Sequence, residues 1–513
     1  MNSWNGVEEE RIALSSSMLQ TLLQRYFGYN QFRPLQQEIV EHVLQRKDAL
    51  VLMPTGGGKS LCFQLPALAF PGMTLVVSPL IALMKDQVDA LRENGVEAAY
   101  LNSTLSFAEA QRIQHEAEQG HLKLLYAAPE RLAQPWFQQW LQRIDLSCIA
   151  VDEAHCISEW GHDFRPEYRQ LATLRQLLPN LPCVALTATA NERVRKDIIA
   201  QLKLENGRVF SSSFNRPNLT YHIRQKRQSF EQLLELLGSY QGASVIIYCV
   251  SRKDTERIAS GLTARGFKAS PYHAGLAPEA RAHAQERFIR DEAPIIVATI
   301  AFGMGIDKPN VRLVVHLDLP KSVEGYYQET GRAGRDGLPS NCVLFYSAGD
   351  RFKQDFFIDQ LTNEQEQQRA RKQLAEMIAY CETNRCRRRH LLQYFGEVWE
   401  KERCDSCDRC LTPASTVPKQ DYSKEVSTLA ALILSLRGAY GVEHVLDIAR
   451  GAKVKKIRDR GHDRLPGYGS LTGRAEDELK HIMREALEAG LFKKEGDRYP
   501  VIVIPKETSE RLA

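Results

Sequence analysis

Residues 49–60 read ALVLMPTGGGKS, an apolar run that leads into three glycines, a lysine and a serine. The run is typical of a strand buried in a parallel sheet, and a helical pattern follows it. Glycines in this context let backbone N–H groups face phosphate oxygens, and the helix adds its positive N-terminal end. Lys59 is expected to reach the β- and γ-phosphates of a nucleotide, and the Ser60 hydroxyl is expected to bind Mg²⁺. The candidate nucleotide contacts of this stretch are Thr55, Gly56, Gly57, Gly58, Lys59 and Ser60.

A glycine-rich surface turn is the alternative interpretation, because Met53 stands where the strict phosphate-loop pattern has glycine. An acidic pair further along the chain argues against a simple turn. Asp152 and Glu153 follow the apolar run 148–151, and the carboxyl end of such a strand faces the crevice where ligands bind. Asp152 is therefore expected to hold Mg²⁺, and Glu153 to orient and deprotonate an attacking water. A solvated strand end is the alternative for this pair.

Short β-branched runs alternate with helical patterns between about residues 48 and 346. Helical segments such as Leu80–Asn94 and Arg252–Arg265 separate the runs, and a glycine closes each of these two. The alternation predicts an α/β fold, and its length predicts two sheets that meet near Ser211–Asn218. The expected strands are Ala49–Met53, Thr74–Ser78, Leu124–Ala127, Ile149–Val151, Val184–Leu186, Val245–Cys249, Ile295–Ala298, Leu313–Leu317 and Val343–Tyr346.

Composition and charge limit the classes of protein to consider. The 513 residues are 43% hydrophobic and 25% charged, which excludes a disordered or collagen-like chain. The chain has no apolar window of about 18 uncharged residues, and residues 1–17 lack the apolar core of a secretion signal. We therefore expect a cytoplasmic protein without a membrane segment. The net charge of +4 is too small to indicate nucleic acid by itself.

Four of the 11 cysteines form a cluster. Two residues separate Cys404 from Cys407 and Cys407 from Cys410, and Cys386 lies upstream of them. Four soft thiolates fit tetrahedral Zn²⁺. A [4Fe–4S] cluster is the alternative, although its usual spacing requires a cysteine at position 414, which is Ala414. The other seven cysteines are interpreted as small core residues of a reduced protein.

Taken together, these motifs resemble those of superfamily-2 helicases. The stretches similar to motifs I, II, III and VI are residues 57–60, 152–155, 187–189 and 326–335. Phe32–Gln36 and Trp160–Pro166 resemble the RecQ family of DNA helicases in particular. The resemblance covers about residues 15–505.

The resemblance implies two RecA-like parallel-sheet domains, a helical zinc-binding subdomain and a winged-helix domain. The expected bounds are residues 1–212, 213–346, 347–413 and 414–513. The pattern after residue 422 agrees with a winged helix, since short helices, a glycine-rich break at Gly467–Gly473, a longer helix and a terminal hairpin follow one another. The family's zinc-binding subdomain also favours zinc at the cysteine cluster.

The resemblance further implies roles around the nucleotide. Tyr29, Arg33 and Gln36 belong to the segment that recognises adenine, although Gln36 alone would read as a polar residue on a helix surface. Arg332 and Arg335 are expected to cross from the second domain to the γ-phosphate, with surface ion pairing as the alternative. Gln328 lies in the same motif as these arginines, and Asp307 in a stretch expected to meet both nucleotide and DNA.

Aromatic and basic residues indicate the DNA contacts. Aromatic and cationic side chains follow the acidic pair and favour a platform on which single-stranded bases stack, with an apolar loop packed on the core as the alternative. These residues are Trp160, His162, Phe164, Arg165 and Tyr168. A basic stretch near the C-terminus is expected to contact duplex phosphates. It contains Lys453, Lys455, Lys456, Arg458 and Arg460. Tyr499, beyond the hairpin turn, is a candidate strand-separating wedge.

These observations predict an ATP- and Mg²⁺-dependent helicase that unwinds DNA. The family resemblance implies 3′ to 5′ polarity, action on forks, junctions and recombination or repair intermediates, and binding of both single-stranded and duplex DNA. Single-strand-binding protein and other repair factors are the expected protein partners of a monomer associated with the bacterial nucleoid. An RNA helicase or a translocase, and a DNA-binding regulator with an inactive ATPase fold, are the alternatives.

Overall fold

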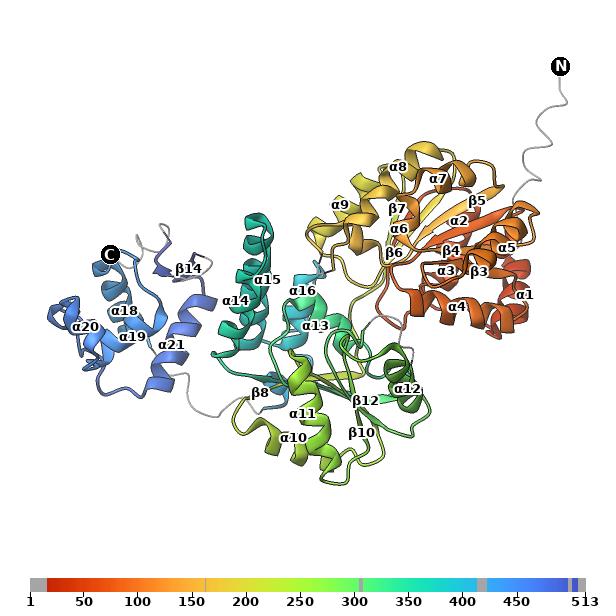
Figure 1. The fold of residues 1–513 in the computed structure, drawn as a ribbon. Helices are drawn as coiled ribbons and strands as arrows, with labels where there is room; N and C mark the ends of the chain where they lie inside the picture. Colours follow the sequence, from red (N-terminus) through yellow and green to blue (C-terminus); the bar gives the residue numbers. More distant parts are fainter. Residues whose placement is uncertain (1–15, 162, 304–307, 413–421, 497–500, 506–513) are drawn as a thin grey trace, which may run out of the picture. The chain divides into compact units, whose positions relative to one another are not determined.

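A computed structural model describes residues 16–161, 163–303, 308–412, 422–496 and 501–505 (Figure 1). The contacts of the chain divide it into two units, each of which is described by itself. The first unit contains Met1–Ser347 and Leu391–Glu400, and the second contains Ala348–His390 and Lys401–Ala513.

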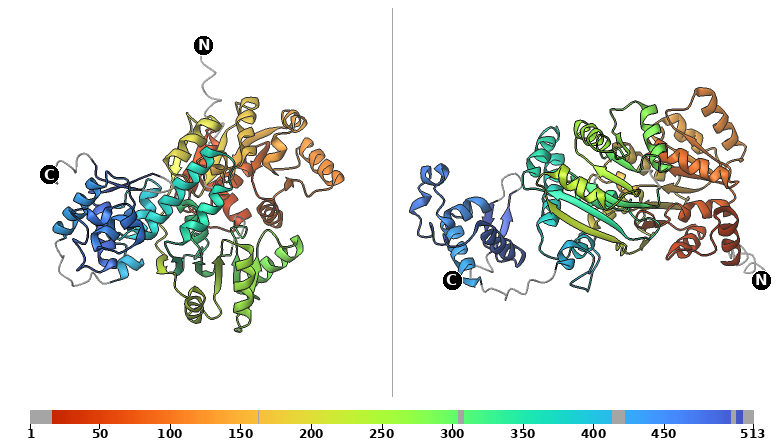
Figure 2. Two further views of the ribbon diagram at one scale, coloured as in Figure 1. Left: turned by 60° about the vertical axis from the view of Figure 1, so that its left-hand side comes forward. Right: turned by 90° about the horizontal axis from the view of Figure 1, so that it is seen from below.

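Seven parallel strands of the first unit form one sheet in the order β3-β4-β2-β5-β6-β1-β7. Leu50 and Leu52 of β1 face one core, and Ala49 and Val51 face another, so that apolar residues occupy both faces. Helices cover the two faces, as Figures 1 and 2 show. The strands are β1 (Ala49–Leu52), β2 (Met73–Val77), β3 (Ala98–Leu101), β4 (Leu124–Ala127), β5 (Leu146–Val151), β6 (Cys183–Thr187) and β7 (Arg208–Ser211).

The helices of this first half precede or connect those strands. They are α1 (Ser16–Phe27), α2 (Gln36–Leu44), α3 (Leu61–Ala69), α4 (Ile81–Glu93), α5 (Phe107–Glu118), α6 (Pro129–Leu132), α7 (Pro135–Leu141), α8 (Gln170–Leu177) and α9 (Glu192–Leu202). Two short 3₁₀ helices, η1 (Ala154–Ile157) and η2 (Pro166–Arg169), follow β5.

A second parallel sheet has the order β10-β11-β9-β12-β13-β8. Its strands are β8 (Leu219–Gln225), β9 (Ser244–Tyr248), β10 (Ala269–Tyr272), β11 (Ile295–Ala298), β12 (Val311–His316) and β13 (Ser340–Tyr346). The accompanying helices are α10 (Ser229–Gly238), α11 (Arg252–Thr263), α12 (Pro278–Ile289) and α13 (Val323–Thr330). The predicted fold class, with two parallel sheets followed by smaller domains, is confirmed.

All nine predicted strands are present, and the structure adds β3, β7, β8 and β10. These four are the edge strands of the two sheets. An edge strand has one neighbour and needs less apolar surface, so its sequence carries a weaker signal. Strand β10 also contains Pro271, which is tolerated at an edge.

Among the residues that the structure describes, the second unit is helical apart from one hairpin. Helix α16 (Arg387–Tyr394) leads from it back into the first unit. The predicted terminal hairpin is confirmed, because β14 (Lys493–Glu495) pairs antiparallel with β15 (Val501–Val503). The remaining helices are α14 (Asp350–Asp359), α15 (Glu364–Glu382), α17 (Asp408–Leu411), α18 (Ser423–Ser435), α19 (Val442–Arg450), α20 (Lys455–Asp459), η3 (His462–Arg464) and α21 (Glu476–Glu488). None of the helices described is long and apolar enough to cross a membrane.

Candidate functional site

The glycine loop lies between β1 and α3 and depends on its glycines. Gly56 and Gly58 have φ angles of +78° and +82°, which other residues rarely adopt. The Gly57 N–H donates to the Pro54 carbonyl oxygen at 2.9 Å, and a Cβ atom on Gly57 would lie only 2.9 Å from that same oxygen. The loop is therefore too tightly folded for side chains at these positions.

Lys59 lies between this loop and the acidic pair at the end of β5. Its ammonium donates to the Met53 carbonyl oxygen at 3.3 Å. Burial lowers the pKa of Lys59, while the Glu153 and Asp152 carboxylates oppose that change. Burial and the neighbouring Glu153 charge raise the pKa of Asp152 to about 7. The predicted phosphate-binding lysine and the predicted acidic pair are thus neighbours, and Ser60, beside Lys59, accepts a hydrogen bond from Gln87 at 3.3 Å.

Glu153 is held in an unusual conformation by its neighbours. Its φ of 47° is in the left-handed region, where a non-glycine residue is strained. A carboxylate oxygen of Glu153 lies 3.3 Å from His155 Nδ1, and the same nitrogen lies 2.9 Å from the Thr187 hydroxyl. Burial alone would lower the pKa of His155, but the Cys156 and Glu153 side chains hold it well above its ordinary value. His155 therefore connects the acidic pair to Thr187 at the end of β6.

The candidate adenine residues contact the glycine loop. Gln36 is buried, and its amide donates to the Gly58 carbonyl oxygen at 3.0 Å and accepts from the Arg33 N–H at 2.8 Å. The Arg33 guanidinium also donates to the Gly56 carbonyl oxygen. Tyr29, by contrast, is 54% exposed. The Gln36 and Arg33 side chains thus join this segment to the backbone of the loop, while the Tyr29 ring stays available to a ligand.

The two candidate finger arginines differ in position. A Cβ atom on Gly56 would lie 3.3 Å from Arg335 Cγ, and the Arg335 charge acts to lower the pKa of Lys59. Arg332 is buried and hydrogen-bonds to the Tyr248 hydroxyl within its own sheet domain. Of the two, Arg335 therefore contacts the glycine loop.

The second sheet domain contains two further candidates, of which the structure describes one. Gln328 is buried on α13, upstream of both arginines. The candidate Asp307 lies outside the described residues.

Arg216 joins the two sheet domains and was not predicted from the sequence. Its guanidinium donates to the carbonyl oxygens of Thr55 and Gly331, each at 3.2 Å. It also donates to those of Ala333 and Gly334, at 2.9 and 3.0 Å. The only local signal was its position before Pro217 in the predicted seam, which does not identify a partner 161 positions away in sequence.

The aromatic segment after β5 is divided between surface and core. Trp160 and Phe164 are half-buried, with the guanidinium groups of Arg193 and Arg169 over their rings. Arg165 pairs with Asp163 at 3.2 Å and donates to the Pro79 carbonyl oxygen at 2.8 Å. The candidate His162 lies outside the described residues.

The prediction that Tyr168 stacks on DNA bases is wrong for this structure. The Tyr168 side chain is fully buried in the core of the first sheet domain. Its hydroxyl donates to the Asp152 carbonyl oxygen at 3.0 Å. The short helix η2 turns this ring inward, so that it supports the acidic pair instead of offering a face to a base.

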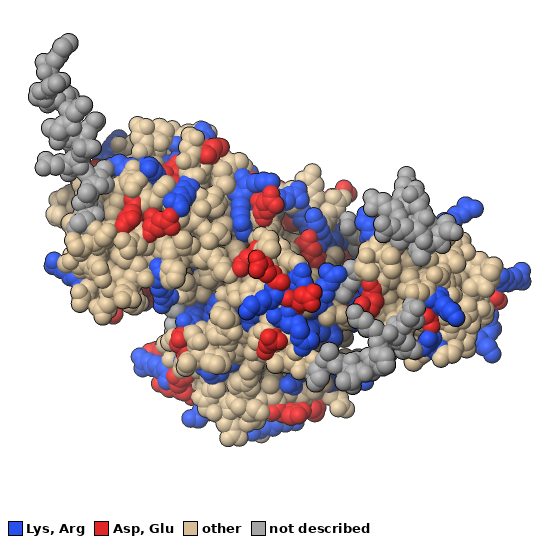
Figure 3. Space-filling view, turned by 180° about the vertical axis from the view of Figure 1, so that it is seen from behind, with Lys and Arg blue, Asp and Glu red and all other residues tan. Residues whose placement is uncertain are grey.

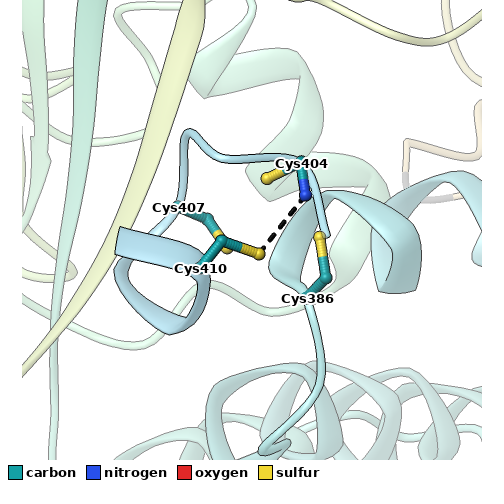
Figure 4. A group of neighbouring side chains, drawn as sticks. All are labelled: Cys386, Cys404, Cys407 and Cys410. Carbon is teal, nitrogen blue, oxygen red and sulfur yellow. Dashed lines mark hydrogen bonds between the residues drawn. The ribbon is translucent and has the colours of Figure 1, made fainter. Parts of the chain in front are cut away.

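The four clustered cysteines converge in the second unit (Figure 4). Their sulfur atoms all lie within 4.8 Å of one another. Tetrahedral zinc with bonds of about 2.3 Å requires sulfur atoms about 3.8 Å apart, so the arrangement fits that metal. Because the thiols hydrogen-bond to one another, the pKa of Cys404 is lowered while those of Cys386 and Cys407 are raised.

The surroundings of the cysteines stabilise this arrangement. The backbone N–H of Cys404 donates to the Cys410 sulfur at 3.3 Å. The fully buried Arg387 forms two hydrogen bonds to the Asp408 carboxylate, at 3.0 and 3.2 Å. It thereby ties the start of α16 to α17.

The basic candidates near the C-terminus are exposed. Lys453, Lys455, Lys456, Arg458 and Arg460 have no ion pair with any residue that the structure describes. Arg450 differs, because it pairs with Glu476 at 2.6 Å and with Asp447 at 3.1 Å. On the face shown in Figure 3, basic side chains lie among acidic ones, in keeping with the small net charge. Tyr499 lies outside the described residues.

Comparison with protein families gives four matches that together span most of the chain. The families are described as DEAD/DEAH box helicase (residues 33–198), helicase conserved C-terminal domain (228–337), RecQ zinc-binding (348–411) and RQC domain (416–513). The cysteine cluster thus falls within the zinc-binding match.

Two relatives are similar over nearly the whole chain. The ATP-dependent DNA helicase RecQ of Pasteurella multocida is 44% identical over 96% of this chain and 78% of its own length. The protein of the same name from Bacillus subtilis is 41% identical over 94% of this chain and 82% of its own length.

Solved structures give a similar fold at low identity. The DEAD-box helicase Mss116 bound to single-stranded RNA and UDP-BeF has a TM-score of 0.55 at 16% identity, over 75% of this chain and 90% of its own. The DUF1998 helicase MrfA bound to DNA has a TM-score of 0.55 at 18% identity, over 66% of this chain and 53% of its own. These likenesses support the two-sheet fold.

Replacing Cys410 with serine should remove one of four metal ligands. We expect the zinc content to fall from one atom per chain towards none and the region around residues 386–412 to become sensitive to protease, because structural zinc contributes directly to folding. Metal analysis and limited proteolysis measure both effects. Cys381→Ser is the control, since Cys381 is buried outside the cluster and its loss should leave zinc bound. Iron and visible absorbance in the wild-type protein would contradict the zinc assignment.

Proposed function

The chain belongs to the RecQ family of ATP-dependent DNA helicases, and on this basis we propose that it uses ATP and Mg²⁺ to unwind duplex DNA with 3′ to 5′ polarity. Forks, junctions and intermediates of repair and recombination are the proposed substrates. One observation carries the proposed ATP hydrolysis: Arg335, from the second sheet domain, lies against the glycine loop of the first, beside Lys59.

The proposed hydrolysis assigns a role to each charged residue. Lys59 and Arg335 stabilise negative charge on the phosphates, and Glu153 orients the water and accepts its proton. Mg²⁺ held by Ser60 and Asp152 would neutralise phosphate charge. Burial and the Glu153 charge raise the pKa of Asp152, and a bound Mg²⁺ would counter that shift by favouring the ionised carboxylate.

We also propose how hydrolysis produces relative movement of the two sheet domains. An arginine supplied by the second domain makes the reaction depend on the closure of the two sheet domains over ATP. Tyr29, Arg33 and Gln36 are proposed to bind adenine, and Gln328, Arg332 and Asp307 to complete the site from the second domain. Nucleotide binding then closes the two domains, and nucleotide release opens them.

DNA is proposed to contact two separate surfaces. Trp160, His162 and Phe164 with Arg165 would stack on and contact the single strand, where their place after Glu153 can connect DNA to hydrolysis. The exposed basic residues of the winged-helix region would contact duplex phosphates, and Tyr499 is the proposed wedge. Single-strand-binding protein as a partner and a monomeric state stay predictions.

An RNA helicase is the second candidate, because solved structures with a similar fold are bound to RNA. Those structures are only 16–18% identical to the chain and support the fold alone. The RecQ zinc-binding and RQC matches favour DNA.

Unwinding assays on forks, junctions and duplexes with 3′ or 5′ overhangs test the proposal. We expect ATP- and Mg²⁺-dependent unwinding of forks and of 3′-tailed duplexes, with DNA stimulating phosphate release more than RNA does. Lys59→Ala should abolish hydrolysis and leave DNA binding largely intact, because the phosphate and DNA sites are separate. Lys47→Ala, an exposed lysine outside the loop, is the matched control. Stimulation by RNA alone, or unwinding only from 5′ tails, would refute the proposal.

Replacing Arg335 or Arg332 with alanine should lower the kcat of ATP hydrolysis to different extents. Arg335→Ala is expected to lower kcat by roughly 10³-fold with little change in ATP affinity, because the group acts mainly in the transition state. Arg332→Ala should cost less, since Arg332 is bonded to Tyr248 and not to the glycine loop. Steady-state ATPase kinetics with saturating DNA measure both. A larger loss for Arg332→Ala would reverse the assignment.

Replacing Lys453, Lys455, Lys456 and Arg458 together by alanine should weaken duplex binding. Each lost phosphate contact is expected to reduce the slope of log affinity against log salt by roughly 0.9. Fork unwinding should fall more than ATPase activity on single strands. The control is Lys480→Ala, because Glu476 already pairs with that ammonium at 2.6 Å. An unchanged salt slope would show that these residues do not bind the duplex.

A further inference from the structure

Residues 391–400, here called the 391–400 segment, contact the first unit although the chain on either side belongs to the second. Helix α16 begins directly after the metal ligand Cys386 and ends at Tyr394. The segment then turns at Gly396, whose φ is +78°, and the Glu397 N–H donates to the Leu392 carbonyl oxygen at 2.9 Å. A short, well-formed turn is thus inserted into the ATPase part of the chain.

An aromatic cluster holds this turn. Phe395 is fully buried, and its ring stacks on Phe214 with a centroid distance of 4.7 Å and an interplanar angle of 11°. The Tyr327 ring lies 4.9 Å from Phe395, and its hydroxyl donates to the Phe214 carbonyl oxygen at 2.7 Å. Phe214 belongs to the linker between the two sheets, and Tyr327 belongs to α13. Phe395 therefore packs against both the linker and the helix that leads to the finger arginines.

Polar contacts connect the same turn to the first sheet domain. The Tyr394 hydroxyl donates to the Glu324 carboxylate of α13. The same carboxylate oxygen accepts from the Asn191 amide at 3.0 Å, and Asn191 caps α9 just after β6. Arg195 of α9 donates to the Phe395 carbonyl oxygen at 2.7 Å. One carboxylate oxygen of Glu324 on α13 thus binds both the N-cap residue of α9 and Tyr394 of the 391–400 segment.

Glu397 fixes the linker directly. Its carboxylate accepts from the Ser213 hydroxyl at 2.6 Å and from the Phe214 N–H at 2.7 Å. Two residues further along the linker, Arg216 bridges Thr55 of the glycine loop and Gly331 after α13. A shift of the linker would therefore move the contact between the two halves of the ATP site.

We propose that the 391–400 segment is a positioning element of the ATPase, in which Tyr394 and Glu397 hold α13 and the linker where Arg335 meets the glycine loop. The inference rests on the proposed ATP hydrolysis. Glu324 is almost fully buried, and a buried carboxylate is stable only when donors satisfy it. Loss of the Tyr394 hydroxyl therefore weakens the position of α13, while Lys59, Arg33 and Gln36 stay in place in the first sheet domain.

This separation predicts a specific kinetic result. Tyr394→Phe keeps the ring and removes one hydrogen bond to a charged group, so kcat of DNA-stimulated hydrolysis should fall about tenfold. The KM for ATP should change less than about twofold, because the first domain still binds the nucleotide. Tyr240→Phe is the matched control, since Tyr240 also loses a hydrogen bond, from Asn341, away from the glycine loop.

Variants of Glu324 and Glu397 distinguish positioning from general stability. Glu324→Gln keeps an oxygen that accepts from Tyr394 and Asn191 and should retain most of kcat, whereas Glu324→Ala should lose it. Tyr394→Phe added to Glu324→Ala should cause little further loss, because both remove the same contact. Glu397→Ala, which acts on the linker alone, should also lower kcat and not raise KM.

Several outcomes would overturn the inference. An unchanged kcat in both Tyr394→Phe and Glu397→Ala, an equal rise in KM, or fully additive losses would show that the segment does not position the site. A parallel fall in zinc content or in the denaturation midpoint would show a purely structural role. Wild-type protein without DNA-stimulated hydrolysis would instead refute the proposed function, so the two failures are distinguishable.

Discussion

The Arg335 side chain lies against Gly56, on a loop that belongs to the other parallel sheet. Arg216 strengthens this junction, since its guanidinium bonds to carbonyl oxygens on both sides. Neither sheet domain alone contains the whole of the proposed ATP site. Within the first unit, the two sheets each build one side of the junction, and Arg216 and residues 391–400 hold the two sides together.

Charge balance around the junction explains the unusual features of the acidic pair. Burial raises the pKa of Asp152 and lowers that of Lys59, and the two groups oppose each other's shifts. Glu153 has a strained, left-handed φ of 47°. His155 contacts the Glu153 carboxylate, and the Tyr168 hydroxyl donates to the carbonyl oxygen of Asp152. Strain of this kind persists only where the surrounding contacts determine the conformation.

One segment that follows the two sheets in sequence packs against the same junction. Cys386, one of the four clustered cysteines, directly precedes α16, and α16 ends within the 391–400 segment at Tyr394. The segment contacts α9 through Phe395, α13 through Tyr394 and the linker through Glu397. The 391–400 segment thus packs with the two sheet domains, although the chain on either side of it belongs to the second unit.

The sequence by itself determined the features that local patterns encode. The glycine loop, the acidic pair, the four cysteines and the nine inner strands follow from spacing and from apolar runs, which depend only on neighbours in the chain. The edge strands, the burial of Tyr168, the contact of Arg335 rather than Arg332 with the glycine loop, and the contacts of Arg216 and the 391–400 segment depended on tertiary structure. Arg216 meets Thr55 across 161 positions and Tyr394 meets Glu324 across 70, and no local pattern specifies which distant group packing brings into hydrogen-bond range.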